Sequence, residues 1–145
     1  MHHYKESGLR DVWLANGFQE RDSPYGKTIA IWDVEGLHRA ICLRLIATKP
    51  RLSGAEFRFL RKDLDMSQVR LASILGNDAQ SVALWERKGR VPVWADRFIR
   101  ALYREVAEGN AQIIKLVDRL NEVDQAEHQR LTFERTGRGW KLKAA

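Results

Sequence analysis

Two short capped segments separated by a glycine constrain the fold of this chain more than any other feature. Ser67 and Asp78 are residue types that cap helix N-termini, and Gly76 between them readily adopts the left-handed backbone that ends a helix. The first segment carries the apolar residues Val69, Leu71, Ala72 and Leu75, and the second, 79–87, presents Val82 and Trp85 inward. The pattern predicts a helix, a tight turn of about three residues and a second helix.

The flanking segments predict one more helix on each side of this pair. Ser53 is an N-cap for a basic amphipathic helix with the apolar stripe Phe57, Leu60 and Leu64. The sequence Gly89-Arg90-Val91-Pro92 interrupts the helical pattern. After it, a further helical stripe consists of Trp94, Phe98, Leu102 and Tyr103.

The first fifty residues predict a small β piece followed by a helix. Segments 12–15 and 28–32 are rich in strand-forming residues, and the turn-forming sequence Ser23-Pro24-Tyr25-Gly26 lies between them. They predict two strands joined by a long loop. Asp33 is an N-cap for a helix over about 34–47, which Lys49-Pro50 ends.

The segment after the helical unit changes from a helical to a β pattern. Gly109 and Asn110 interrupt the helices, and an acidic helix with an apolar stripe follows. The stripe consists of Ile113, Leu116, Val117, Leu120 and Val123. Residues 131–133 and 140–142 alternate apolar and polar side chains around the turn sequence 136–139, which predicts a terminal β-hairpin.

These elements predict an α+β chain that is mainly α. Residues 1–50 form the β piece and its helix, 53–104 the helical unit, and 105–145 the acidic helix and the hairpin. A chain of 145 residues is about one domain with appendages. No apolar run approaches the roughly 20 residues of a membrane span, and residues 1–10 lack the apolar core of a secretory signal. We therefore expect a cytoplasmic protein without a membrane partner.

The charge distribution locates candidate nucleic-acid surfaces. The chain has a net charge of +6 from 25 basic and 19 acidic side chains. Residues 53–104 have 10 basic and 6 acidic side chains and residues 128–145 have 5 and 1, whereas residues 105–127 have 2 and 6. We expect a nucleic-acid face on the helical unit, the tail or both. In the tail, the cations around Arg138 either contact DNA or only keep a hairpin in solution.

Four sequence features occur together in the helical unit: a capped Ser67-Gln68 start, a Leu71-Ala72 pair, Gly76 in the turn, and Trp85-Glu86 near the end of the second helix. With them, segment 53–104 resembles the lambda-repressor-like, Cro/C1-type (XRE) helix-turn-helix family. The resemblance implies a regulator that binds duplex DNA with its second helix in the major groove. It also implies an internal ion pair between Arg61 and Glu86.

By position in that motif, one face of the second helix is implied to read bases. The base-reading residues are Ala79, Gln80 and Ala83, of which Gln80 can bond adenine bidentately. Gln68 is implied to bond a phosphate at the start of the first motif helix. Further phosphate contacts are expected from Ser81, Arg87, Lys88 and Arg90. Leu84 lies between the reading face and the core, and Asp78 is expected to cap the helix.

These assignments predict a transcriptional repressor or autoregulator that acts as a homodimer. One recognition helix covers about half of a site, and two copies on a palindrome place half-sites roughly 34 to 36 Å apart. The apolar stripe that runs from Ile113 to Val123 is the candidate dimer interface. The alternative is that the stripe packs within the chain, against the N-terminal β piece or the terminal hairpin.

A second similarity implies an alternative function. The segments Met1–Leu9, Val12–Leu14 and Asp33–His38 are similar to regulators grouped with MqsA-type antitoxins. That similarity implies an antitoxin that neutralises a partner toxin and autoregulates its operon. The paired zinc-binding cysteines of such antitoxins are absent, because Cys42 is the only cysteine. We expect no metal and no other cofactor.

An enzyme is the competing class, and its candidate constellation is Asp33, Glu35 and His38. Glu35 and His38 are i and i+3 neighbours on a helix, which permits a metal pair. Acidic residues at a helix N-terminus are also favoured by the helix dipole alone, and no third ligand is near in sequence. Cys42 is expected to be a small buried side chain. We therefore expect a binding protein without catalytic residues.

Overall fold

The chain is α+β and mainly α, as predicted. The computed structural model describes residues 1–123 and 130–143. The helices are α1 (Val34–Thr48), α2 (Gly54–Asp63), α3 (Gln68–Leu75), α4 (Ala79–Lys88), α5 (Val93–Ala107) and α6 (Gln112–Val123), preceded by a short 3-10 turn, Lys5–Ser7. The strands are β1 (His2–His3), β2 (Trp13–Leu14), β3 (Phe18–Ser23), β4 (Gly26–Ile31), β5 (Phe133–Thr136) and β6 (Gly139–Leu142). The end of the acidic stretch, 124–127, lies outside the described residues.

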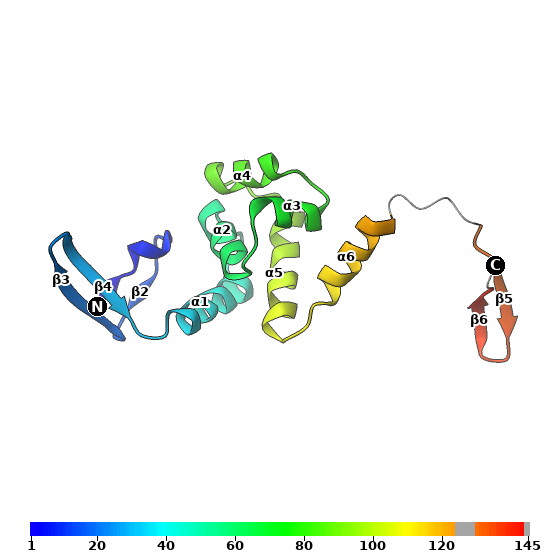
Figure 1. The fold of residues 1–145 in the computed structure, drawn as a ribbon, viewed down its shortest axis with the longest axis horizontal. Helices are drawn as coiled ribbons and strands as arrows, with labels where there is room; N and C mark the ends of the chain where they lie inside the picture. Colours follow the sequence, from blue (N-terminus) through cyan, green and yellow to red (C-terminus); the bar gives the residue numbers. More distant parts are fainter. Residues whose placement is uncertain (124–129, 144–145) are drawn as a thin grey trace.

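Helices α1 to α5 lie next to one another in the middle of the chain (Figure 1). Their buried side chains form one hydrophobic core. Its fully buried members include Cys42, Phe57, Leu60, Leu71, Val82, Ile99 and Leu102. Complete burial of one such large apolar side chain contributes about 1.5–3 kcal/mol relative to exposure. Since these residues come from all five helices, the core fixes the orientation of α4, the helix that carries the candidate base-reading residues.

Side-chain caps begin the helices where the sequence predicts them. The Ser53 hydroxyl accepts a bond of 3.1 Å from the Glu56 N–H, and the Glu56 carboxylate accepts one of 2.7 Å from the Ser53 N–H. Ser67 and Asp78 likewise each accept a bond from the backbone three residues onward. Gly76 ends α3 with φ +67°, a conformation that glycine adopts without strain. The predicted helix, turn and helix is confirmed.

The N-terminal β piece differs from the prediction in its pairing. β2, within segment 12–15, pairs with β1, whereas β4 pairs with β3 in an antiparallel hairpin closed at Ser23 and Gly26. The sequence does not predict β3, because its central residues are polar and lack the alternation of a half-buried strand. Main-chain pairing with β4 makes this segment a strand. The two predicted strands therefore belong to separate two-stranded sheets, and β3 lies within the segment predicted as a long loop.

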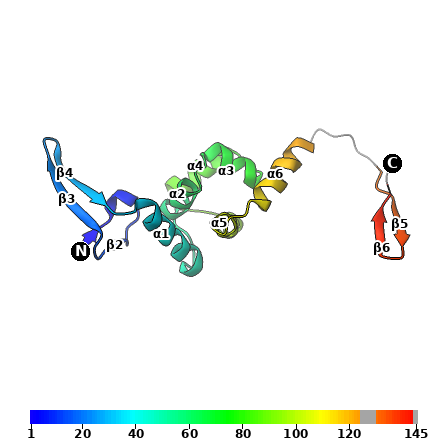
Figure 2. The same cartoon turned by 60° about the horizontal axis from the view of Figure 1, so that its bottom comes forward.

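Contacts around Tyr4 attach the N-terminal strands to α1 and α2. The Tyr4 hydroxyl lies 2.7 Å from His38 Nε2, and the His38 ring meets the Phe59 ring edge-on at 5.0 Å. Leu9, which follows the 3-10 turn, is buried in the same core as α1 to α5. In Figures 1 and 2 these strands lie beyond α1, at the end of the helical region opposite α6.

Some predicted apolar positions differ from expectation in their burial. Val69 on α3 is 69% exposed and Trp94 on α5 is 48% exposed, while Trp85 is only partly buried. The Trp85 ring is edge-on to Phe57 at 6.1 Å and to Trp94 at 5.6 Å, so Trp94 covers Trp85 from outside. Ile99 takes the fully buried place on α5 that the predicted stripe does not include.

The predicted terminal hairpin is confirmed as β5 and β6. Phe133 pairs with Leu142 and Arg135 with Trp140 across the two strands. Every described residue from 130 to 143 is exposed.

Candidate nucleic-acid interface

Helix α4 is held against α2 by close backbone packing at its C-terminal end. A Cβ at Gly54, the first residue of α2, would lie 2.3 Å from the Glu86 carbonyl oxygen and 2.6 Å from that of Trp85. Only glycine allows the two helices to approach this closely. Val82, one turn before Glu86 on the same helix, is fully buried. These contacts turn the opposite side of α4 to solvent.

A buried ion pair also fixes α4 against α2. Arg61 Nε and Nη2 donate to the two carboxylate oxygens of Glu86 at 2.8 and 2.9 Å, and the side chains are 8% and 4% exposed. Arg61 Nη1 also donates to the Met66 carbonyl at 2.8 Å. The pair implied by the family resemblance is therefore present. It removes the only acidic side chain of α4 from the surface.

The solvent-facing side of α4 carries the residues assigned to base reading. Gln80 is exposed, and Ala79 and Ala83 are half-buried on the same helix. Leu84, the position between face and core, is 41% exposed and so belongs to the outer face. An amide flanked by small apolar side chains offers paired hydrogen-bonding groups without steric obstruction.

Most of the residues expected to contact phosphates lie at one end of this face. Arg87, Lys88 and Arg90 are exposed at the C-terminal end of α4 and just after it, and Ser81 is half-buried near its start. Gln68 lies at the start of α3 and donates from Nε2 to Glu86 Oε1 at 3.1 Å. This bond occupies one of the two amide protons and orients the side chain. The second amide proton of Gln68 is left to donate to a phosphate.

Different caps give the two motif helices different electrostatics. Asp78 caps α4 with a carboxylate, and the bonds from the Ser81 backbone and side chain hold the pKa of Asp78 below its usual value. Its negative charge offsets the positive end of that helix dipole. Ser67 caps α3 with a neutral hydroxyl, so the positive end of α3 is not offset by its cap. Of the two starts, that of α3 is the better placed to attract a phosphate.

Helix α6 divides the predicted apolar stripe between the core and solvent. Ile113 and Val117 pack against the core formed by α1 to α5, whereas Leu116, Leu120 and Val123 are 57%, 53% and 48% exposed. Polar contacts attach α6 to α3: Arg70 and Asp118 form two bonds of 2.7 and 3.0 Å, and Asn121 Nδ2 donates to Ser73 Oγ at 3.2 Å. Among the described residues, α6 contacts α3 and α5; the alternative to a dimer interface names other partners within the chain, the N-terminal β piece or the terminal hairpin.

These α3–α6 contacts have no signal in the sequence. Arg70 and Asp118 are separated by 48 positions, and neither lies in a recognisable motif. Only the path of the chain after α5 brings them together, so a pattern read along the sequence does not identify them.

Asp33 and His38, two of the residues considered for an enzyme, make structural contacts. Asp33 accepts a bond from the Gly36 N–H and caps α1, and His38 bonds Tyr4. Cys42 is fully buried, and burial raises the pKa of its thiol to about 12, which disfavours the reactive thiolate. Within residues 1–123 and 130–143, no group of three His, Cys, Asp or Glu side chains is arranged to hold a metal ion.

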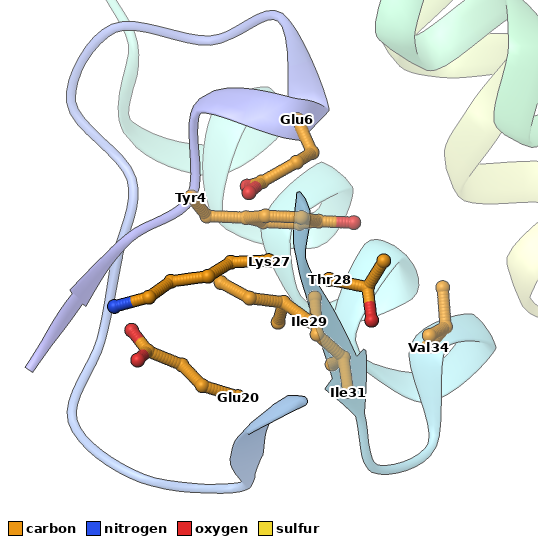
Figure 3. A pocket seen from close by; sticks show the side chains of 8 residues that line it. All are labelled: Tyr4, Glu6, Glu20, Lys27, Thr28, Ile29, Ile31 and Val34. Atoms are coloured by element: carbon orange, nitrogen blue, oxygen red, sulfur yellow. The ribbon is translucent and has the colours of Figure 1, made fainter. Parts of the chain in front are cut away.

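A separate concavity lies in the N-terminal β region. It has a volume of about 510 Å³, and Figure 3 shows its lining side chains. They come from the N-terminal segment, from both strands of the β3–β4 hairpin and from the start of α1: Tyr4, Glu6, Glu20, Lys27, Thr28, Ile29, Ile31 and Val34. Burial, with the nearby Glu6 charge as a smaller cause, raises the pKa of Tyr4, whose hydroxyl is hydrogen-bonded to His38 Nε2.

Comparison with family models, with curated proteins and with solved structures gives no match for this chain. In the part of the chain that the structure describes, no helix combines the length and the apolar character needed to cross a bilayer.

Proposed function

We propose that this protein is a sequence-specific regulator that binds double-stranded DNA, acting as a transcriptional repressor or autoregulator. The observation that carries the proposal is the outer face of α4. That face presents Gln80 with Ala79, Ala83 and Leu84, and Arg87 and Lys88 lie at its C-terminal end. An α-helix fits the major groove of B-DNA, where base edges are distinguishable.

The buried pair between Arg61 and Glu86 supports this assignment electrostatically. A carboxylate on the outer face of α4 would be repelled by the phosphates of a duplex. Glu86 is instead 4% exposed and neutralised by Arg61. The basic residues at the end of α4 therefore act on a nearby polyanion without an opposing charge from the same helix.

The proposal includes a homodimer formed through α6. Leu116, Leu120 and Val123 follow one another at intervals of four and three residues, so they form a continuous exposed line on the helix. Apolar side chains in such a line are typical of helix–helix association. Two copies joined in this way would present two α4 helices to a palindromic site. Leu120→Asp should shift the protein to a monomer in light scattering, and an unchanged mass would remove α6 from the interface.

Substitutions on α4 test the DNA-binding proposal. Gln80→Ala should weaken binding to the preferred duplex by about 1–3 kcal/mol and leave binding to random duplex nearly unchanged. Lys88→Ala should weaken both alike and flatten the salt dependence, because it removes a phosphate contact. Gln19→Ala, an exposed glutamine on β3, is the matched control and should bind as wild type. Equal loss for Gln80→Ala on both duplexes would contradict a reading role.

The antitoxin alternative is favoured by exposed aromatic side chains in the N-terminal β region. Trp13, Tyr25 and Trp32 are 55%, 99% and 81% exposed, and such residues are enriched in protein interfaces. The partner in this case is a toxin, with DNA binding kept for autoregulation. Co-expression with the product of a neighbouring gene tests it: wild type should co-purify with that product, and Trp32→Ala should not. Failure of wild type to retain it would leave the regulator alone.

A further inference from the structure

The C-terminal hairpin presents apolar side chains to solvent. Trp140 is 75% exposed, and Phe133 and Leu142 are 55% and 54% exposed. Cross-strand pairing places Phe133 opposite Leu142 and Arg135 opposite Trp140, so these four side chains share one face. Because an isolated two-stranded hairpin is at best marginally stable in water, a face of this kind indicates that the hairpin has a partner.

Positive charge is concentrated on the same hairpin. Residues 130–143 contain one acidic residue, Glu134, and five basic residues: Arg130, Arg135, Arg138, Lys141 and Lys143. All of them are exposed. The cations occupy both faces of the hairpin and its turn, because Lys141 pairs with Glu134 on the face opposite Arg135, and Arg138 lies between the strands.

The β3–β4 hairpin provides a comparison within the chain. It is also two-stranded and antiparallel, but residues 18–31 contain two basic and two acidic side chains and have no net charge: Arg21, Lys27, Glu20 and Asp22. The excess charge is therefore specific to the C-terminal hairpin and is not needed to form a hairpin in this chain.

The charge favours duplex DNA over a second copy of the hairpin as the partner. Two hairpins packed face to face would add their positive charges and bring Arg135 of each copy near the other, which opposes association. B-DNA carries one negative charge per about 1.7 Å of its axis. Its major groove also admits a two-stranded β-ribbon, whose edges then face the phosphates of both strands. Cations on both faces and in the turn suit that position.

We propose that the C-terminal hairpin is a second DNA-binding element, which adds sequence-independent phosphate contacts through Arg135, Arg138 and Lys141. This inference rests on the proposed function in that both elements bind duplex DNA. α4 supplies the choice of sequence, and the hairpin supplies affinity and salt dependence.

Two triple variants of the full chain test the inference. Arg135→Gln/Arg138→Gln/Lys141→Gln removes three cations from the hairpin, and Arg10→Gln/Arg21→Gln/Lys27→Gln removes three exposed cations from the N-terminal β region. The dissociation constant for a random duplex of about 30 base pairs, three helical turns, is measured from roughly 50 to 200 mM salt. We expect the slope of log affinity against log salt to fall by about 2 to 3 for the hairpin variant, since each lost phosphate contact removes about 0.9. The N-terminal variant should keep nearly the wild-type slope.

The other outcomes overturn the inference and separate it from the proposed function. Equal slopes for the two triple variants would mean that the hairpin contacts no phosphate. An unchanged slope with a larger mass in light scattering would assign the hairpin to self-association, because the variant removes the charges that oppose it. If Lys88→Ala weakens binding and the hairpin variant does not, this inference alone fails. If wild type binds no duplex, both fail.

Discussion

Helices α4 and α6 are each joined to a neighbour by a two-bond arginine–carboxylate pair, in different surroundings. Arg61 and Glu86 bond at 2.8 and 2.9 Å with side chains 8% and 4% exposed. Arg70 and Asp118 bond at 2.7 and 3.0 Å with side chains 39% and 43% exposed. Water and salt screen an exposed pair and leave a buried one largely unscreened. The buried pair therefore holds α4 with little effect of salt, whereas the exposed pair that holds α6 weakens as salt increases.

This difference matches the roles proposed for the two helices. A base-reading helix has to be held in one orientation, since its contacts with base edges depend on position. Around α4, Val82 in the core, Gly54 against its C-terminal end and the Arg61–Glu86 pair all act together. A dimer helix instead has to leave apolar surface for a partner, and α6 leaves three apolar side chains exposed.

The largest predicted effect is the loss of the buried carboxylate. Glu86→Ala leaves Arg61 charged and buried without its main partner, which should lower the free energy of unfolding by about 3–5 kcal/mol. Urea denaturation measures this as a lower midpoint. Asp118→Ala is the matched variant in the exposed pair and should leave the midpoint close to that of wild type. Similar midpoints for the two variants would remove the distinction between the pairs.

A smaller loss is predicted for the contact between α2 and α4. Gly54→Ala places a methyl group against the Glu86 and Trp85 carbonyls, so the helices have to separate. We expect a loss of about 1–3 kcal/mol, the usual range for overpacking. Gly137→Ala is the control, because a Cβ there meets nothing within 4 Å. If thermal denaturation gives the same midpoint for Gly54→Ala and wild type, α4 is less closely packed than the structure indicates.

The smallest effect concerns the dependence of α6 on pH and salt. The bond from Arg70 holds the pKa of Asp118 below its usual value. The stabilisation is therefore present above the carboxyl pKa of the unfolded chain, about 3.9, and is lost as pH falls through the lower pKa of the folded state. At neutral pH, 1 M salt should speed hydrogen exchange of α6 amides while α4 amides stay protected, since the screening length is then about 3 Å. Equal acceleration in both helices would contradict the comparison.

Local chemistry made the helical part of the fold predictable. A cap acts on backbone groups two or three residues away, so Ser53, Ser67 and Asp78 mark helix starts without knowledge of the rest of the chain. Gly76 likewise marks the turn, because the left-handed backbone that ends α3 is a local property of glycine. The candidate reading face follows from these boundaries, because the burial of Val82 fixes which side of α4 remains outside.

Contacts between distant segments made the remainder unpredictable. β3 is a strand because β4 folds back on it, and its own polar sequence gives no such signal. Contacts between α3 and α6, made by Arg70 of α3 and Asn121 of α6, decide which side of α6 faces the core. Periodicity alone therefore cannot tell the buried residues of the stripe from the exposed ones. Trp94 has the spacing of a core residue but covers Trp85 from the surface.

The central claim is that a firmly held α4 reads sequence in duplex DNA. Selection of bound sites from a random duplex pool at about 150 mM salt tests it most directly, because the phosphate contribution is weakened there. We predict an enriched palindrome whose half-sites are one helical turn apart, and loss of that enrichment for Gln80→Ala. A folded wild-type protein that enriches no sequence would contradict the claim.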